Sequence, residues 1–357
     1  MRYLVTLKPV GNYFFGGEVT LGDGTTQNYN VSSNSLPQAA SLLGLMRYEI
    51  LRQNNLLSYD ASNKEVLGKV KKLIGEGGFS LSEKEERESF GILKGLSPVF
   101  LYKPSKDRYY TVERVDISQR GADEKVKHTV SVRTSSENRC SYSVEDRMEG
   151  QEKEEGWMTQ IQIPSFDAKK QDYNTYWCDN EWNRIPNPFT FVEQIGITKN
   201  EKKDNEKDAF FKQKMVRLDP SLCMAFTVDV VEGNNIAAEK HWVYLGGNRS
   251  LFEMTIQQTD IDFRTYFKTL HQEGSLLALG DAFLPDEDKR KCLFVWGECE
   301  PCRYMENQVN QKHSWKKPKK SSMYHLQKRG SVIYANAEIL RRLQNCKFQN
   351  LGLNIFI

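Results

Sequence analysis

The chain opens with an alternation of apolar and polar positions that is typical of a half-buried strand. Tyr3, Val5 and Leu7 fall on one face of this segment, because successive side chains of a strand point to opposite faces. An aromatic and glycine run, Tyr-Phe-Phe-Gly-Gly, occupies residues 13–17. Residues 22–34 are rich in Gly, Asn and Ser, and this composition predicts a loop.

A helix is predicted directly after this loop. Apolar side chains recur there at the spacing of one helix face: Leu36, Ala39, Ala40, Leu43, Met46 and Ile50. Ser35 is a suitable N-cap, and Pro37 suits the first turn, where a missing N–H costs nothing. The opening of the chain therefore predicts a strand, a glycine loop and a helix in succession.

Strand patterns outnumber helical ones in the rest of the chain. Further helices are predicted over 64–74, 262–271 and 337–343. Strands are predicted over 92–102, 109–117, 125–132, 210–218, 223–231, 241–245, 251–256, 292–296, 331–334 and 351–357. The second and third of these strands, joined by a short Gly-containing segment, predict a hairpin. Because strands lead and helices intervene singly, the pattern favours an α+β fold with antiparallel sheets.

Composition narrows the class of protein. A length of 357 residues predicts two domains, and 39% hydrophobic residues exclude a wholly disordered chain. The apolar runs are far shorter than the roughly 20 residues of a membrane helix, and the N-terminal strand pattern lacks a signal-peptide core. Seven scattered cysteines in a chain of this size favour a reducing compartment. We expect a cytoplasmic protein that does not contact a membrane.

Motifs for catalysis and cofactor binding are absent from the sequence. It contains no P-loop, no dinucleotide fingerprint and no Gly-x-Ser-x-Gly elbow. None of the five histidines belongs to a His-Glu-x-x-His pair, and the first 127 residues contain none. A metal-free ribonuclease usually needs a histidine as general acid or base. The sequence therefore predicts a protein that is not an enzyme and has no cofactor.

A zinc site stays open as an alternative. Cys299 and Cys302 form a Cys-x-x-Cys, with Cys292 upstream and His313 downstream. Four such ligands can hold zinc tetrahedrally, yet no second Cys-x-x-Cys completes the pattern. A coincidental turn is the simpler interpretation.

Positive charge is concentrated near the C-terminus. Residues 307–337 contain no acid and seven basic residues, so the rest of the chain, at a total of +3, sums to −4. These basic residues are Lys312, Lys316, Lys317, Lys319, Lys320, Lys328 and Arg329. Trp315 and Tyr324 are interleaved with them, and unpaired bases stack on aromatic rings. This basic window predicts a site for single-stranded RNA, with a solubilising loop as the alternative.

Three glycine loops lie at predicted strand ends, and two of them adjoin an arginine. They are 16–17, 246–247 with Arg249, and Gly330 with Arg329. Glycine lets backbone N–H groups approach phosphate without interference from Cβ, and arginine can fork onto phosphate oxygens. Each loop alone is compatible with an ordinary turn, but together they favour contacts to a nucleic-acid backbone.

These motifs carry a resemblance to a known family. Residues 36–47, Leu-Pro-Gln-Ala-Ala-Ser-Leu-Leu-Gly-Leu-Met-Arg, resemble the first helix of RAMP-superfamily CRISPR proteins, and 13–17 resemble the opening of one RAMP family. The segments 195–197, 210–218, 245–249 and 329–334 follow in that family's order. It is the Cmr-module subunit that grips the 5′ handle of the guide RNA in type III-B effector complexes. The chain departs from the family's usual motifs at two positions that concern the handle contacts. The family often has a charged residue before the glycine that corresponds to Gly16, which this chain lacks, and often has an acid where this chain has Asn248.

The resemblance implies a fold and a set of partners. It implies two ferredoxin-like (RRM-like) domains with antiparallel sheets and long insertions, over residues 1–187 and 188–357. It implies a non-catalytic subunit that caps the 5′ handle of the CRISPR RNA, with target RNA nearby. It further implies docking of the large polymerase-type subunit and of the first backbone RAMP subunit. We expect the hairpin over 109–132 to be the thumb that such subunits push through the guide–target duplex.

The charge pattern, the glycine loops and the resemblance together identify candidate RNA-binding residues. They are Tyr13, Phe14, Phe15, Gly16, Gly17, Gln38, Arg47, Gly246, Gly247, Asn248, Arg249, Lys316, Lys317, Lys319, Lys320, Lys328, Arg329 and Gly330. Two alternatives are kept. One is a RAMP endoribonuclease that processes precursor CRISPR RNA, with His128 as its base. The other is a structural scaffold whose basic window contacts acidic groups of a protein.

Overall fold

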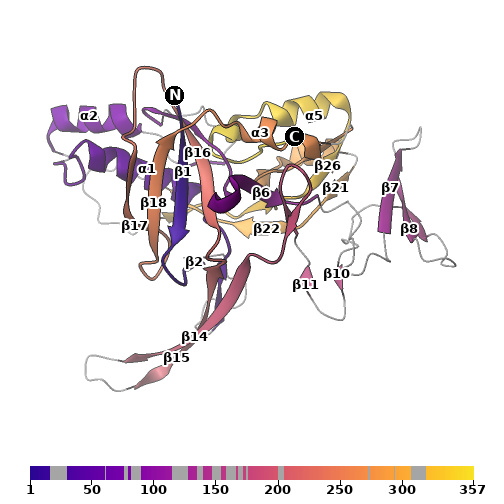
Figure 1. Cartoon of the computed structure of the whole chain (residues 1–357), viewed down its shortest axis with the longest axis horizontal. Coiled ribbons are helices and arrows are strands. Elements are labelled where there is room, and N and C mark those ends of the chain that lie inside the picture. The colour runs from indigo at the N-terminus through magenta and orange to yellow at the C-terminus, as the bar shows by residue number, and fades with distance from the viewer. Residues whose placement is uncertain are drawn as a thin grey trace.

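The structure is a computed structural model of the whole chain (Figure 1). The residues that it describes are 1–16, 30–60, 62–75, 79–81, 90–114, 128–134, 140–146, 154–157, 166–167, 172–173, 176–199, 205–271, 274–292, 294–306 and 319–357. Gly17, Lys316 and Lys317 of the candidate site lie outside these ranges.

A nine-stranded sheet, here the first sheet, forms the centre of the molecule. Its order is β13-β12-β6-β5-β16-β1-β18-β17, with β4 also paired to β16, and all these pairs are antiparallel. The strands are β1 (Arg2–Pro9), β4 (Leu93–Leu96), β5 (Phe100–Lys103), β6 (Arg108–Val112), β12 (Trp177–Cys178), β13 (Arg184–Ile185), β16 (Cys223–Val230), β17 (Glu239–Tyr244) and β18 (Leu251–Gln258). The four strands β5, β16, β1 and β18 stand second, third, first and fourth in chain order, which is the ferredoxin-like arrangement.

α1 covers one face of the first sheet, and α2 packs on α1 (Figure 1). α1 (Ala39–Gln53) packs Leu43 and Met46 into the same core as Val5 and Leu7 of β1. The helix begins four residues later than Ser35, and its N-cap is Gln38, which makes no side-chain capping bond. α2 (Lys64–Ile74) has the predicted bounds, because Asn63 caps its first turn by accepting from two backbone N–H groups.

A second ferredoxin-like unit follows near the C-terminus. It contains β19 (Ser275–Leu277), α4 (Asp286–Lys291), β21 (Phe294–Trp296), β26 (Val332–Tyr334) and α5 (Ala337–Gln344). β26 pairs antiparallel with both β19 and β21, and the terminal Ile357 exchanges backbone hydrogen bonds with Leu277 on the free side of β19. From the Ile357 side, the strand order is fourth, first, third, second, which is the order of the first sheet counted from β18 to β5. The predicted α+β class with antiparallel sheets and ferredoxin-like units is confirmed.

The second unit packs on the face of the first sheet that lies opposite α1. Leu4, Phe100 and Ala225 of the first sheet share a core with Leu277, Trp296 and Val332 of the second unit. Phe263 and Phe267 fill the space between them. They come from α3 (Phe263–Tyr266) and its boundary with η2 (Lys268–Leu270), so the helix predicted over 262–271 is one short helix and a 3₁₀ turn.

The predicted hairpin over 109–132 is wrong. β6 pairs with β5 and β12, whereas β7 (His128–Thr134) pairs with β8 (Cys140–Asp146). Tyr109 and Tyr110 are buried within the body of the protein, and this burial fixes β6 inside the first sheet. Alternation predicts that a segment is a strand, but it does not determine which strand pairs with it.

A different hairpin projects from the body of the molecule. β14 (Phe189–Lys199) and β15 (Asn205–Leu218) form a long antiparallel pair that extends downward and away from the first sheet in Figure 1. At its base, β15 pairs in parallel with β3 (Asn30–Asn34), and β3 pairs with β2 (Phe15–Gly16). β3 therefore occupies the end of the segment predicted as a loop over 22–34.

The other elements form small sheets and turns. They are β9 (Glu154–Trp157), β10 (Phe166–Asp167), β11 (Asp172–Tyr173), β20 (Ala282–Phe283), β22 (Cys299–Cys302), β23 (Met305–Glu306), β24 (Lys319–Lys320), β25 (Tyr324–Gln327), η1 (Pro104–Lys106) and η3 (Lys347–Asn350). No helix in the described part of the chain is long and apolar enough to span a membrane.

The predicted domain boundary at 187–188 falls between β13 and β14, within the stretch of chain that builds the first sheet. Strands from both sides of it, such as β1 and β16, are hydrogen-bonded neighbours. The second ferredoxin-like unit begins only at β19. Strand pairing gives no support to a boundary at 187–188, and the division into domains there stays a prediction.

Candidate nucleic-acid interface

The aromatic segment 13–15 runs through the interior. Tyr13 exchanges backbone hydrogen bonds with Val216 of β15, and its hydroxyl donates to the Ser35 carbonyl over 2.8 Å. Burial raises the pKa of the Tyr13 hydroxyl well above its usual value. The ring of Phe15 stacks on Phe252 with centroids 5.8 Å apart. The side chains of Tyr13 and Phe15 therefore stabilise the core, and only a rearranged protein would offer them to RNA.

The glycine pair 246–247 lies in the loop that joins β17 to β18 and packs on the aromatic segment. The Gly247 N–H donates to the Phe14 carbonyl over 2.8 Å. A Cβ on Gly246, whose φ is +85°, would lie 2.4 Å from the same carbonyl oxygen. A Cβ on Gly247 would lie 2.9 Å from Cδ1 of Phe14. This close approach requires glycine at both positions, independently of any phosphate.

The next two residues bring the loop to the surface. Asn248 and Arg249 are exposed and have φ angles of 55° and 52°. The Asn248 side-chain amide donates to Oε1 of Gln213 on β15 over 2.6 Å. Gly16, also exposed, lies on β2 beside β3. We define residues 13–16 and 246–249 as the aromatic–glycine junction. The fold thus joins two predicted RNA-binding segments from distant parts of the sequence.

The two candidates of α1 lie apart from each other. The Gln38 carbonyl accepts from the N–H groups of Ser41 and Leu42 at the start of the helix, and the helix start is tied to the junction through Ser35. Arg47 lies nine residues further, about 13 Å along the helix axis. Its guanidinium is 5.3 Å from the centroid of the Phe90 ring, a cation–π contact.

Arg329 and Gly330 lie where the second unit meets the first sheet. The Arg329 side chain is only 14% exposed, and its guanidinium donates to the Val99 carbonyl over 2.6 Å. Burial lowers the pKa of the Arg329 guanidinium, and Asp281 acts in the opposite direction. A Cβ on Gly330, whose φ is +83°, would lie 2.5 Å from Cγ1 of Val112. An RNA contact through Arg329 would require these internal bonds to break.

The lysines of the basic window differ in their surroundings. The Nζ of Lys328 lies 2.5 Å from Oε2 of Glu300 in an ion pair. Lys320 is exposed on β24, beside Lys319 in the sequence. Lys319 and Lys320 form β24, which pairs with β23, and Lys319 is opposite Glu306 in that pair.

The Cys-x-x-Cys forms a strand rather than a turn. Cys299 is exposed and Cys302 is buried at the two ends of β22. Residues three apart on a strand point to opposite faces, so these two thiols do not converge on one metal ion. His313 lies outside the described residues.

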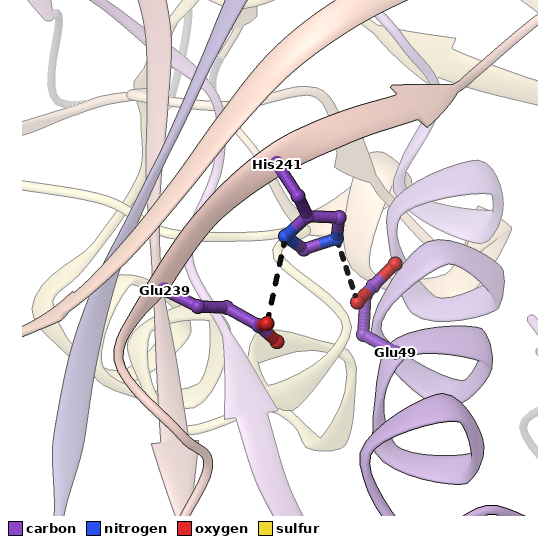
Figure 2. A group of neighbouring side chains, drawn as sticks. All are labelled: Glu49, Glu239 and His241. Atoms are coloured by element: carbon purple, nitrogen blue, oxygen red, sulfur yellow. Dashed lines mark ion pairs between the residues drawn. The ribbon is translucent and has the colours of Figure 1, made fainter.

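One group in the described part of the chain has the geometry of metal ligands: Glu49 on α1 with Glu239 and His241 on β17 (Figure 2). Nε2 of His241 lies 3.0 Å from Oε2 of Glu49, and Nδ1 lies 3.9 Å from Oε2 of Glu239. Arg52 already donates to Glu49 over 2.8 Å and contacts Glu239 as well. A metal ion would meet the positive charge of Arg52, and the ion pairs of Arg52 with Glu49 and Glu239 instead form an ionic link between α1 and β17.

Sequence reasoning missed this link. The carboxyl group of Glu49 is fully buried, and buried carboxyl groups require partners. The only signal was an acid three residues after Met46, on the apolar stripe of α1. Its partner His241 is far away in the sequence, and no local pattern connects the two residues.

Residues 5–306 match the family model described as CRISPR-associated protein (Cas_Cmr3). The chain belongs to the Cas_Cmr3 family. The predicted resemblance to a Cmr-module CRISPR protein is thereby confirmed. No curated protein matches the chain.

Two solved structures are similar to this Cas_Cmr3-family chain in fold. One is a cryo-EM structure of the type III-B Cmr-beta bound to cognate target RNA, with a TM-score of 0.53 and 12% identity. The other is the type III-B Cmr-beta bound to cognate target RNA and AMPPnP, state 1, with a TM-score of 0.50 and 11% identity. Each comparison covers 100% of this chain and 96% of the other. At this identity the likeness supports the fold alone.

Proposed function

We propose that the protein is a non-catalytic, RNA-binding subunit of a type III-B Cmr effector complex. In this proposal the aromatic–glycine junction caps the 5′ handle of the CRISPR RNA. The proposal rests on one observation. The segments 13–16 and 246–249, which both resemble motifs of the family, meet at one surface loop, where the Gly247 N–H donates to the Phe14 carbonyl. Family membership and the overall likeness to Cmr-beta support the assignment to the complex.

The junction offers specific chemistry for an RNA end. The exposed guanidinium of Arg249 can bind a phosphate with two hydrogen bonds. The neighbouring Asn248 is held by Gln213, so the loop has a fixed conformation on β15. A fixed loop can discriminate the shape of a handle, because it does not pay the entropy of ordering on binding. Lys319 and Lys320 would add phosphate contacts that do not depend on sequence.

The projecting hairpin β14–β15 is our candidate for contact with neighbouring subunits and the guide–target duplex. Phe191 and Ile195 are 51% and 61% exposed on one face of β14, on the same side as Glu193. Large exposed apolar side chains usually mark interaction surfaces. This hairpin takes the thumb role that the sequence suggested for 109–132. We further expect the first backbone subunit to bind here and the large polymerase-type subunit to bind the body of the protein.

The proposal is tested by replacing Arg249 with Ala in the assembled complex. Loss of a charge-assisted contact should weaken binding of handle-bearing guide RNA roughly tenfold, and should weaken binding of a guide with a scrambled handle less. Arg341→Ala is the matched control, because Arg341 is an exposed arginine on α5. Equal affinities for the two variants would refute handle capping at the junction and favour the scaffold alternative.

The proposal that the protein is not catalytic has its own test. The purified protein should leave labelled repeat RNA intact in the presence of Mg²⁺ or Mn²⁺. His128 stands on β7 and is the general base of the processing-enzyme alternative. RNA cleavage that disappears in His128→Ala would establish that alternative instead.

A further inference from the structure

The first sheet has one face that is covered unevenly. Leu4, Thr6 and Lys8 of β1 share this face, because they alternate with the core residues of the strand. Leu4 is buried under the second unit, whereas Lys8 at the other end of β1 is exposed. The same face continues over β18 and β17, since Lys8 is opposite Glu253 and Glu253 is opposite Trp242. The second unit therefore leaves the β17 end of this face open.

Two large aromatic side chains stand on this open part. Trp242 is 58% exposed and Tyr244 is 67% exposed. Both lie on β17, the edge strand of the first sheet (Figure 1). Residues two apart on a strand are about 6.8 Å apart along it, so the two rings form a row. We define Lys8, Lys240, Trp242 and Tyr244 as the aromatic edge face.

We propose that the aromatic edge face binds single-stranded RNA, with bases stacked on Trp242 and Tyr244. The proposal extends the proposed function, because it gives the RNA a path away from the junction. Stacking on aromatic side chains suits unpaired bases of any sequence, since every base has a π-face. Tyr244 stands two residues before Gly246. A strand that leaves the aromatic–glycine junction would therefore run along β17 from Tyr244 toward Glu239.

The charges on this face favour an anionic strand. Lys8 and Lys240 stand on it together with the acid Glu253, which is opposite Lys8 and lies two residues along β18 from Thr255, the partner of Lys240. The carboxylate of Glu253 is already paired with Nζ of Lys240 over 3.0 Å. Arg249 adds a further positive charge in the loop at the end of β17. Aromatic rings combined with an excess of positive charge are typical of single-strand RNA sites.

The opposite face of β17 is anchored, which holds the two rings in place. His241 and Val243 alternate with Trp242 and Tyr244, so they point toward α1 and the core. Val243 is 5% exposed, and His241 meets the buried Glu49 (Figure 2). An edge strand fixed in this way presents its rings without a large cost of ordering. The ionic link thus serves to position the aromatic edge face.

The test compares variants of the full-length chain by fluorescence anisotropy. The probes are a labelled guide RNA with its handle and an unstructured single-stranded RNA of equal length without it. Trp242→Ala and Tyr244→Ala should each weaken binding of both probes roughly tenfold, whereas Trp242→Phe and Tyr244→Phe should retain most of the affinity. Tyr48→Ala is the matched control, because Tyr48 is a 51% exposed aromatic on α1.

The outcomes separate this proposal from the proposed function. If Arg249→Ala weakens handle binding while both aromatic variants bind normally, the junction stands and the aromatic edge face is overturned. If only the aromatic variants weaken binding, the face stands and the junction fails. If the aromatic variants bind RNA normally but lose a subunit of the assembled complex, the face is a protein contact, and the RNA proposal is overturned. Thermal melts confirm that each variant is folded.

Discussion

Substitution of Gly246 by Ala tests whether close packing or phosphate binding explains the glycine pair. The residue has a φ of +85°, a conformation that costs an alanine about 1 kcal/mol relative to glycine. The added Cβ would also lie 2.4 Å from the Phe14 carbonyl oxygen and 2.8 Å from Cδ1 of Phe15. Because the nearest atom belongs to the backbone, the aromatic segment must shift, at a cost of about 1–3 kcal/mol. We expect a total loss of about 2–4 kcal/mol in the free energy of unfolding.

A second glycine provides the matched control with the opposite sign. Gly44 lies inside α1, and a Cβ placed there meets no atom within 4 Å. Alanine stabilises a helix interior by about 0.5–1 kcal/mol relative to glycine. Gly44→Ala should therefore raise the free energy of unfolding, while Gly246→Ala lowers it. The two values are measured by urea denaturation, with tryptophan fluorescence and circular dichroism as independent probes.

The result has a direct bearing on function. Should Gly246→Ala prove as stable as the parent protein, the close approach to Phe14 does not constrain the loop, and our explanation of the glycine pair is wrong. A loss of RNA affinity in that stable variant would then favour a direct phosphate contact at the Gly246 backbone. A loss of stability with unchanged RNA affinity in the folded fraction would support a purely structural role for this glycine.

Three further predictions follow from burial and charge. Leu43→Ala should lower the free energy of unfolding by about 2–5 kcal/mol in urea denaturation, since Leu43 is buried in the main core. A loss below about 0.5 kcal/mol, the usual limit for surface substitutions, would contradict this placement. Arg329→Ala should lower the melting temperature and leave the RNA affinity of the folded protein nearly unchanged, because Arg329 bonds internally to Val99. An unchanged melting temperature with a lower RNA affinity would restore its predicted RNA contact. Replacement of Lys316, Lys317, Lys319 and Lys320 by Gln should flatten the slope of log affinity against log salt by up to about 2.8 if all four contact phosphates, and an unchanged slope would exclude them as phosphate ligands.

Local patterns were sufficient for much of the secondary structure and for the family. The alternation over 3–8 gives β1, whose Val5 and Leu7 are indeed buried, and the apolar stripe over 36–50 gives α1. Both patterns record which face of an element avoids water, and this property depends on neighbouring residues alone. The order of short motifs along the chain likewise sufficed to identify a Cmr-module protein, because order is a property of the sequence itself.

Tertiary structure decided which distant groups meet. The alternation at Tyr109 predicts a strand, but only the sheet assigns β5 and β12 as its neighbours instead of β7. A basic residue next to a glycine has the same local sequence whether it faces RNA or, like Arg329, bonds to Val99 in the interior. Oε2 of Glu49 and Nε2 of His241 lie 3.0 Å apart only because α1 packs under β17. Pairing and burial depend on packing between remote segments. The free energy of a contact depends on both partners, so the sequence around one partner alone does not determine it.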